Sequence, residues 1–184
     1  MELTLDLVAE KLKGWKGCPL AEKANPVLGE GNPHAEIVFI GEAPGQREDE
    51  QGRPFVGPAG KFLDELLTSI GFKRSDVYIT NIVKYRPPQN RDPEPSEKAA
   101  CLPWVKLELA IIRPKVIVVL GKHSLQEFLP KLSISRVHGV PQKITNDVTV
   151  FPIYHPAAAL HNGGLREALF EDFRKLKAFL TLGE

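Results

Sequence analysis

Residues 36–45 of this 184-residue chain read EIVFIGEAPG. The first half of this stretch is a short apolar run bounded by turn residues, which is typical of a strand buried on both faces. Residues 77–80, 115–120 and 149–153 show the same kind of run. Gly41 follows the first run directly, and a glycine lets the backbone approach a ligand closely. The pattern predicts four core strands with a ligand site close to the end of the first.

Helical periodicity fills the intervals between these runs. The predicted helices cover residues 2–13, 60–70, 96–112, 122–129 and 165–180. Gly14 and Gly71 are expected to end the first two, and Pro114 ends the third. Pro103 lies inside the third, where it predicts a kink or a late start. Residues 136–150 predict a hairpin around an Asn-Asp turn.

Strands that alternate with helices predict an α/β fold in which a parallel sheet has helices on both faces. The chain length suits one domain over residues 1–184 and is short for two. In such folds, ligands bind beyond the carboxyl ends of the strands. The loops that follow the predicted strands should therefore share one rim of the sheet. They are residues 41–57, 81–92, 121–124 and 154–164.

The composition is that of an ordinary globular protein, with 42% hydrophobic and 26% charged residues. No apolar run approaches the roughly 18 residues of a membrane span. The N-terminus lacks the basic start and apolar core of a signal peptide, so we expect a cytoplasmic protein. Because the net charge is only +1, any contact with nucleic acid must come from a local patch. Cys18 and Cys101 are expected to be free and buried rather than bridged.

The loop after the first strand holds Glu42 at the strand tip and Phe55 in a segment rich in glycine and proline. A carboxylate is costly to bury at such a position unless it has a partner or a task. A phenyl ring in a loop can stack on a planar ligand. The alternative is a solvated carboxylate and a phenyl ring that fills the core, as most apolar side chains do.

The loop after the second strand begins with Asn81, whose amide offers both a donor and an acceptor. That combination suits the edge of a pyrimidine. Lys84, Arg86 and Arg91 follow, and basic side chains of this kind can contact phosphates. The alternative is an asparagine that caps a turn and basic residues that only solvate a loop.

His155 follows the fourth strand and precedes a proline. A neutral imidazole there can donate a hydrogen bond to an anionic leaving group. Leu160 is expected in an exposed loop, where it suits a wedge between bases. The alternatives are a histidine satisfied by the backbone and a leucine that begins a helix and joins the core. What favours a site is that Glu42, Phe55, Asn81 and His155 are all expected on one rim.

Five linked motifs resemble those of the family 4 uracil-DNA glycosylases. They are GEAPG at 41–45, GRPFVG at 52–57, TNIVK at 80–84, RPP at 86–88 followed by Asn90 and Arg91, and HPA at 155–157. Their order and spacing make a more specific signal than a single glycine pattern. The resemblance implies a three-layer α/β/α sandwich around a four-stranded parallel sheet. It also implies a hydrolase that releases uracil from single- or double-stranded DNA, leaving an abasic site.

The resemblance assigns roles to individual residues. Phe55 would stack on the flipped uracil, Asn81 would bond its Watson–Crick edge, and His155 would stabilise the charge on the leaving base. Glu42 and Glu48 match acidic positions linked with catalysis, and which of them handles the water stays open. The other expected site residues are Gly41 and Ala43 beside the base, and Lys84, Arg86, Asn90, Arg91 and Leu160 at the DNA.

The chain departs from the family at the positions that usually hold a [4Fe–4S] cluster. Family 4 members supply four cysteines, whereas the corresponding positions here are Trp15, Cys18, Tyr85 and Cys101. Such a cluster needs four ligands, and neither tryptophan nor tyrosine is an ordinary iron ligand in it. We therefore expect neither a cluster nor any other metal, with the two aromatic rings filling the vacated volume.

Two further differences concern the chemistry. Better-studied relatives have an aspartate where this chain has Ala43, so the general base of those relatives is absent here. Another branch of the superfamily bonds covalently to DNA through a histidine that follows the second motif, but residues 87–93 contain no histidine. We therefore expect a monofunctional glycosylase, acting as a monomer without a membrane.

Two alternatives remain. The enzyme could act on hypoxanthine, xanthine or another deaminated base, although Asn81 favours uracil, and a substrate panel would separate these cases. The chain could instead be a binding module without turnover, because it has lost cluster ligands. Such a module would shift a uracil oligonucleotide in a gel and leave the base attached.

Overall fold

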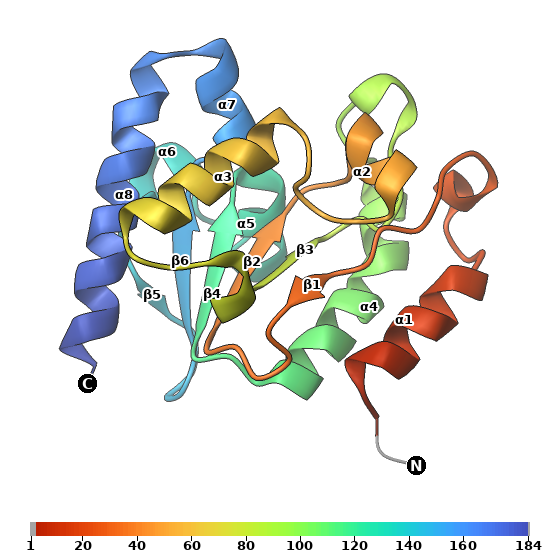
Figure 1. The fold of residues 1–184 in the computed structure, drawn as a ribbon, viewed down its shortest axis with the longest axis horizontal. Helices are drawn as coiled ribbons and strands as arrows, with labels where there is room; N and C mark the ends of the chain where they lie inside the picture. Colours follow the sequence, from red (N-terminus) through yellow and green to blue (C-terminus); the bar gives the residue numbers. More distant parts are fainter. Residues whose placement is uncertain (1–2, 184) are drawn as a thin grey trace.

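The computed structural model describes residues 3–183 (Figure 1). Its sheet has the strand order β1-β3-β2-β4-β6-β5. The strands are β1 (Glu30–Gly31), β2 (Ile37–Gly41), β3 (Tyr78–Asn81), β4 (Val116–Leu120), β5 (Gln142–Lys143) and β6 (Thr149–Ile153). The four central strands are parallel to their neighbours, whereas β1 and β5 pair antiparallel at the two edges. The α/β class is confirmed, but the expected sheet of only four strands is wrong, because two short edge strands extend it.

Helices connect the strands in the order that the periodicity predicts. They are α1 (Leu5–Gly14), α2 (Gln46–Gln51), α3 (Pro58–Ser69), α4 (Pro95–Ile112), α5 (Lys122–Phe128), α6 (Ile134–Val137), α7 (Pro156–His161) and α8 (Gly164–Leu182), with 3₁₀ turns at Pro19–Glu22, Arg74–Asp76 and Pro88–Asn90. All five predicted helices are present. The late start proposed for α4 is wrong, because a capping box between Glu94 and Glu97 starts the helix before Pro103. The predicted hairpin is shorter than residues 136–150, since its first strand begins only at Gln142.

Helices cover both faces of the sheet (Figure 1). Along β2, Ile37 and Phe39 join the core cluster that contains buried residues of α3 and α8. Val38 and Ile40 point the other way, into the cluster that contains buried residues of α4 and α5. Because side chains alternate along a strand, a strand covered on both faces must be apolar at every position. This explains the continuous apolar runs in the sequence.

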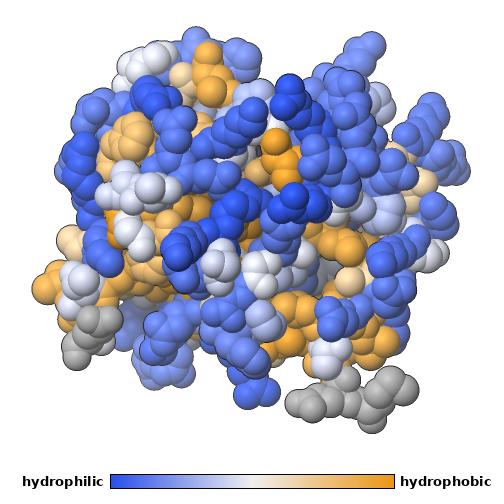
Figure 2. Space-filling view, viewed as in Figure 1, coloured by the Kyte–Doolittle hydropathy of each residue, from blue (hydrophilic) through white to orange (hydrophobic). Residues whose placement is uncertain are grey.

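The surface in Figure 2 is largely hydrophilic on the side shown, and its apolar side chains form separate patches. Among the described residues, five large hydrophobic side chains are exposed. They are Leu3, Val140, Ile144, Leu160 and Leu182. None of the helices over residues 3–183 has both the length and the apolar character that a membrane crossing requires.

The carboxyl ends of the four parallel strands define the rim that the sequence predicts. Gly41 at the end of β2 pairs in register with Asn81 at the end of β3. The N–H of Gly121, directly after β4, donates to the carbonyl of Ile153 at the end of β6 over 2.8 Å. The loops after these strands are therefore neighbours, as the doubly wound topology requires.

Candidate active site

A pocket of about 380 Å³ lies at this rim. Segments after three of the parallel strands line it. They contribute residues 42–48, Phe55 and residues 57–59, then Asn81 with Pro87, Asn90 and Arg91, and finally His155, Ala157 and Leu160. The fourth loop, residues 121–124, does not line the pocket but places His123 behind Glu42. The structure thus brings Glu42, Phe55, Asn81 and His155 to one cavity.

Asn81 is almost wholly buried, at 4% exposure, and its Oδ1 atom has no hydrogen-bond partner among residues 3–183. A buried polar atom without a partner costs about 1–3 kcal/mol, so such atoms usually serve a purpose. Gly41 is packed against this amide, because a Cβ there would come within 2.5 Å of both Asn81 Oδ1 and the Phe55 ring. Asn81 also lines the pocket, so its amide lies beside any ligand that binds there.

His155 is the N-cap of α7, and its Nδ1 accepts a hydrogen bond from the N–H of Ala157 at 3.1 Å. Since Nδ1 is an acceptor, the neutral ring has its proton on Nε2. Burial lowers the pKa of His155 to about 4, so the ring is neutral near pH 7. This arrangement makes the imidazole a fixed donor in the pocket wall.

Phe55 stacks on the His155 ring, with centroids 5.6 Å apart and planes 23° from parallel. The ring is 5% exposed, and the backbone of Phe55 has a φ of 51°, in the left-handed region that few residues other than glycine adopt. Gly60 permits this bend, because a Cβ there would lie 1.9 Å from the Phe55 carbonyl oxygen. A strained backbone at a pocket persists only where its surroundings hold it in place.

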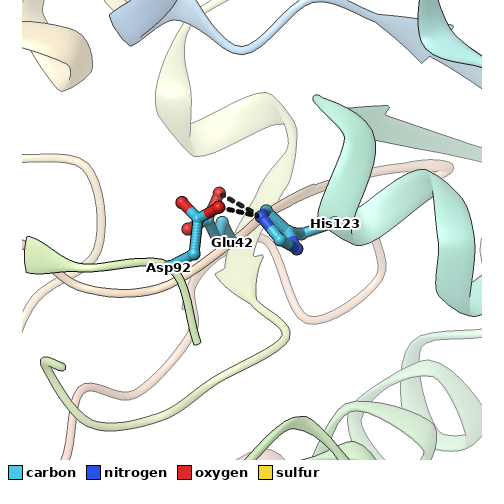
Figure 3. Close-up of side chains that lie close together, drawn as sticks. All are labelled: Glu42, Asp92 and His123. Carbon is cyan, nitrogen blue, oxygen red and sulfur yellow. Dashed lines mark ion pairs between the residues drawn. The ribbon is translucent and has the colours of Figure 1, made fainter. Parts of the chain in front are cut away.

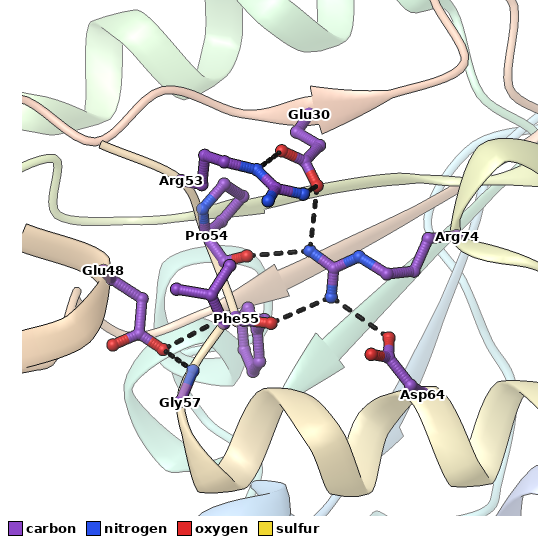
Figure 4. A network of polar contacts seen from close by, with 9 residues as sticks. Glu30, Glu48, Arg53, Pro54, Phe55, Gly57, Asp64 and Arg74 are labelled. Carbon is purple, nitrogen blue, oxygen red and sulfur yellow. Dashed lines mark hydrogen bonds and ion pairs between the residues drawn. The ribbon is translucent and has the colours of Figure 1, made fainter. Parts of the chain in front are cut away.

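Two charged side chains hold the Phe55 segment from opposite sides (Figure 4). Arg74, from the turn before β3, donates to the carbonyl oxygens of Pro54 at 2.8 Å and Phe55 at 2.9 Å. Its guanidinium also pairs with Glu30 at 3.1 Å and Asp64 at 3.2 Å. Such charge-assisted hydrogen bonds are stronger than neutral ones, so Arg74 fixes the strained turn.

Glu48 acts on the other side of the same segment. Its Oε1 atom accepts hydrogen bonds from the N–H groups of Val56 at 3.1 Å and Gly57 at 2.9 Å. Glu48 also lines the pocket, but one of its oxygens is committed to the backbone. Nothing in its immediate sequence predicted this role, because the hydrogen bonds span eight and nine residues along the chain.

Replacing Arg74 should destabilise the protein. Arg74→Met removes two hydrogen bonds to backbone carbonyls and leaves Glu30 and Asp64 without a shared cation. We expect the free energy of unfolding to fall by about 2–3 kcal/mol, measured by urea denaturation. The matched control is Arg53→Met, because the exposed guanidinium of Arg53 pairs with the same Glu30. This substitution should lower the free energy of unfolding by about 1 kcal/mol or less. Equal effects of the two substitutions would show that the contacts to Pro54 and Phe55 add nothing.

Glu42 lies in a small polar cluster at the back of the pocket (Figure 3). Its Oε2 is 3.8 Å from Nε2 of His123, and the same nitrogen is 3.1 Å from Oδ2 of Asp92. Burial raises the pKa of Glu42, and the neighbouring His123 opposes that shift. Three potential ligand atoms here lie within 4.8 Å of one another, but a histidine between two carboxylates accounts for the group without a metal. Sequence reasoning missed His123 and Asp92, because neither belongs to a motif.

The expected contact between Lys84 and phosphates is wrong. The Lys84 side chain is fully buried, and its Nζ bonds to Glu108 at 2.7 Å and Thr80 at 2.6 Å. Glu108 lies on α4, far away in the sequence, and supplies the partner that a buried ammonium requires. Lys84 is therefore part of the protein interior rather than of a DNA-binding surface.

The other residues expected at DNA lie at or near the pocket mouth. Arg86 donates to Asn90 at 2.7 Å, and Arg91 forms two hydrogen bonds with Glu97, at 2.7 and 2.9 Å. Leu160 lies on α7 rather than in a loop, yet it is 47% exposed. Leu160 is therefore neither a loop residue nor part of the core. Its exposed side chain can contact a ligand at the rim.

The four positions that would hold a cluster lie together on the α4 side of the sheet. The hydroxyl of Tyr85, a fully buried residue, donates to the carbonyl of Trp15 at 2.7 Å, and the two rings are 6.0 Å apart. Cys18 and Cys101 are free and buried, as predicted. Burial raises the pKa of Cys101 to about 12, and the nearby Cys18 adds to the shift. Two cysteines beside two packed aromatic rings do not fit a [4Fe–4S] cluster, which needs four thiolates or equivalent ligands.

Comparison with known proteins identifies relatives along most of the chain. The model of the Uracil DNA glycosylase superfamily matches residues 28–177. The chain is 47% identical to a Type-4 uracil-DNA glycosylase of Sulfurisphaera tokodaii, over 95% of this chain and 84% of the relative. It is 45% identical to the Type-4 uracil-DNA glycosylase of Thermotoga maritima, over 97% and 96% of the two chains. A Type-5 uracil-DNA glycosylase of Thermus thermophilus is 35% identical over 61% of this chain and 58% of that one.

Proposed function

The chain belongs to the uracil DNA glycosylase superfamily, and we propose that it hydrolyses the N-glycosidic bond of deoxyuridine in DNA. The products are free uracil and an abasic site, which starts base excision repair. The observation that supports this most directly is the buried, unpaired Oδ1 of Asn81 in a pocket walled by Phe55 and His155. Such a site selects a flat, polar ligand with an N–H donor on its edge.

Uracil has the edge that this amide requires. Its N3–H can donate to Asn81 Oδ1, and its O4 can accept from the amide nitrogen of the same side chain. Cytosine has an acceptor at N3 and a donor at N4, so with the amide in this orientation it would leave the buried acceptor unpaired, which disfavours binding. The base must leave the duplex to reach the pocket, and stacking on an aromatic ring such as Phe55 offsets part of that cost. The exposed Leu160 at the rim is suited to fill the gap in the stack.

Bond cleavage leaves negative charge on the departing uracil and positive charge on the sugar. The fixed Nε2–H of His155 would donate to the uracil oxygen where this charge develops. Glu42 is the better candidate to hold the attacking water, because Glu48 already accepts two backbone hydrogen bonds. The water hydroxyl joins the sugar carbon, and its remaining proton passes to the carboxylate or to solvent.

We also propose that the enzyme works without the family's iron–sulfur cluster. Anaerobically purified protein should be colourless and contain no more iron than a cysteine-free control protein, because only two thiols face the site. Iron and sulfide analysis with a visible spectrum tests this. Restoring cysteines at Trp15 and Tyr85 should allow a cluster to be reconstituted in the double variant. A brown wild-type protein with stoichiometric iron would refute the proposal.

The glycosylase activity itself is tested with an end-labelled oligonucleotide that contains one uracil, incubated in the presence of a chelator. Alkali then cuts the strand at abasic sites. Strand scission at the uracil is expected, and parallel oligonucleotides with hypoxanthine or xanthine test the other bases. Retarded migration in a gel without scission would instead identify a binding module. Gel filtration and cell fractionation test our further expectation of a monomer in the cytoplasm.

A further inference from the structure

We propose that His123 is a positioning residue for Glu42: its ring lies between the Glu42 and Asp92 carboxylates and favours the ionised form of Glu42 at the pocket. The proposal rests on the proposed function, because it assigns Glu42 to the reaction. Neither His123 nor Asp92 lines the pocket, so any effect on the substrate must pass through Glu42.

Three separate segments of the fold bring the side chains of this cluster together. Glu42 follows β2, His123 lies in the first turn of α5 after β4, and Asp92 lies in the segment before α4. In Figure 3 the imidazole points toward both carboxylates. Nε2 lies 3.8 Å from Glu42 and 3.1 Å from Asp92, so the same nitrogen faces both carboxylates.

The three side chains differ in how far they are exposed to solvent. His123 is only 11% exposed, Glu42 is 28% exposed at the pocket, and Asp92 is 65% exposed. Both ring nitrogens of His123 are shielded from solvent, and neither has an ideal hydrogen-bond partner among the described residues. A shielded imidazole nitrogen beside two carboxylates interacts with them more strongly than it would on an open surface. Asp92 responds accordingly, because the His123 ring 3.1 Å away lowers its pKa.

The charges that surround Glu42 explain why His123 is needed. Burial disfavours the charged carboxylate, and the negative charge of Asp92 adds to that effect. His123 is the strongest opposing influence on the pKa of Glu42, ahead of Lys122 and Lys98. Those two lysines have other partners, since Lys122 contacts Asp92 at 3.5 Å and Lys98 contacts Glu127 at 3.6 Å. Without His123, Glu42 would hold its proton to higher pH.

The consequence for the reaction has a definite sign. If Glu42 must be ionised to hold water, the excision rate falls as the pH drops through the pKa of Glu42. An opposite charge within about 4–6 Å lowers a carboxyl pKa, and the partial exposure of Glu42 weakens that effect. Removing His123 should therefore move the acid limb of the pH–rate profile upward by about one pH unit. His155 does not obscure this limb, because its pKa of about 4 lies below it.

The test compares His123→Gln with wild type in single-turnover excision of uracil over about pH 5 to 9, the range that spans raised carboxyl pKa values. We expect the midpoint of the acid limb to rise by about one unit, while the rate on the alkaline plateau changes only a few-fold. His123→Lys should restore the midpoint, because it places a cation beside Glu42. His34→Gln, on an exposed loop, is the matched control and should leave the profile unchanged.

A second readout does not depend on activity. Carbon-13 NMR of glutamate carboxyls in the free protein, with Glu42 assigned through Glu42→Gln, reports its titration directly. The Glu42 midpoint should rise by about one unit in His123→Gln. An unchanged midpoint, or a rate that falls equally at all pH values, would overturn the role of His123. A wild-type protein that leaves uracil attached would overturn the proposed function instead. The NMR titration would still show whether His123 lowers the pKa of Glu42.

Discussion

Asn81→Ala should lower the single-turnover rate of uracil excision by about 100- to 1,000-fold, the range found for the loss of one preorganised polar group in an active site. The buried amide of Asn81 can match both the N3–H and the O4 of uracil from a single side chain. Truncation to alanine leaves those two uracil atoms facing an apolar wall. The loss should therefore affect both binding of the flipped base and the chemical step.

Asn81→Asp sharpens this prediction, because it keeps the shape of the side chain and changes only its chemistry. A carboxylate accepts from N3–H but cannot donate to O4, and its charge repels the anion that forms on the leaving base. We expect the aspartate variant to be at least as impaired as Asn81→Ala. Circular dichroism and urea denaturation should show that both variants fold. Near wild-type excision by either variant would remove Asn81 from base recognition.

The core of the fold was predictable because its signal is local. The runs in β2 and β4 are apolar at every position, and only a strand covered on both faces requires that. The edge strand β1 was not predictable, because two residues cannot display a period, and β5 was expected only as part of a longer hairpin. Helix α2 was missed for a related reason, since none of its residues is buried and its sequence shows no apolar stripe. That the whole chain forms one domain stays a prediction.

The candidate site was predictable only where a residue stands at the end of a strand. Asn81 and His155 occupy such positions, so the sheet alone places them on the rim. Arg74, His123 and Glu108 act through partners that are distant in the sequence, and nothing local marks them. For Lys84 the local sequence was misleading. It is a basic residue in a loop at the rim and was assigned to DNA, whereas its ammonium is buried and bonds to Glu108.

His155→Ala should also lower uracil excision by about 100- to 1,000-fold, because it removes the donor that meets the developing negative charge. The ring is neutral with its proton on Nε2, so it needs no protonation step before the reaction. Wild-type activity should therefore not fall as the pH rises through the ordinary titration range of histidine, near pH 6.5. A requirement for a cationic histidine would produce that fall. His161→Ala, an exposed residue at the end of α7, is the matched control and should retain activity.

The same burial links His155 to stability, with a sign that follows from its lowered pKa. Below about pH 6.5 the unfolded chain takes up a proton at this residue, whereas the folded protein does so only near pH 4. The contribution of the neutral ring is complete above pH 6.5 and is lost as the pH falls toward 4. Urea denaturation across this window should show a steeper loss of stability for wild type than for His155→Ala. Identical pH dependence would mean that the ring is not held neutral, and the fixed Nε2–H donor would then have to be abandoned as the group that meets the leaving uracil.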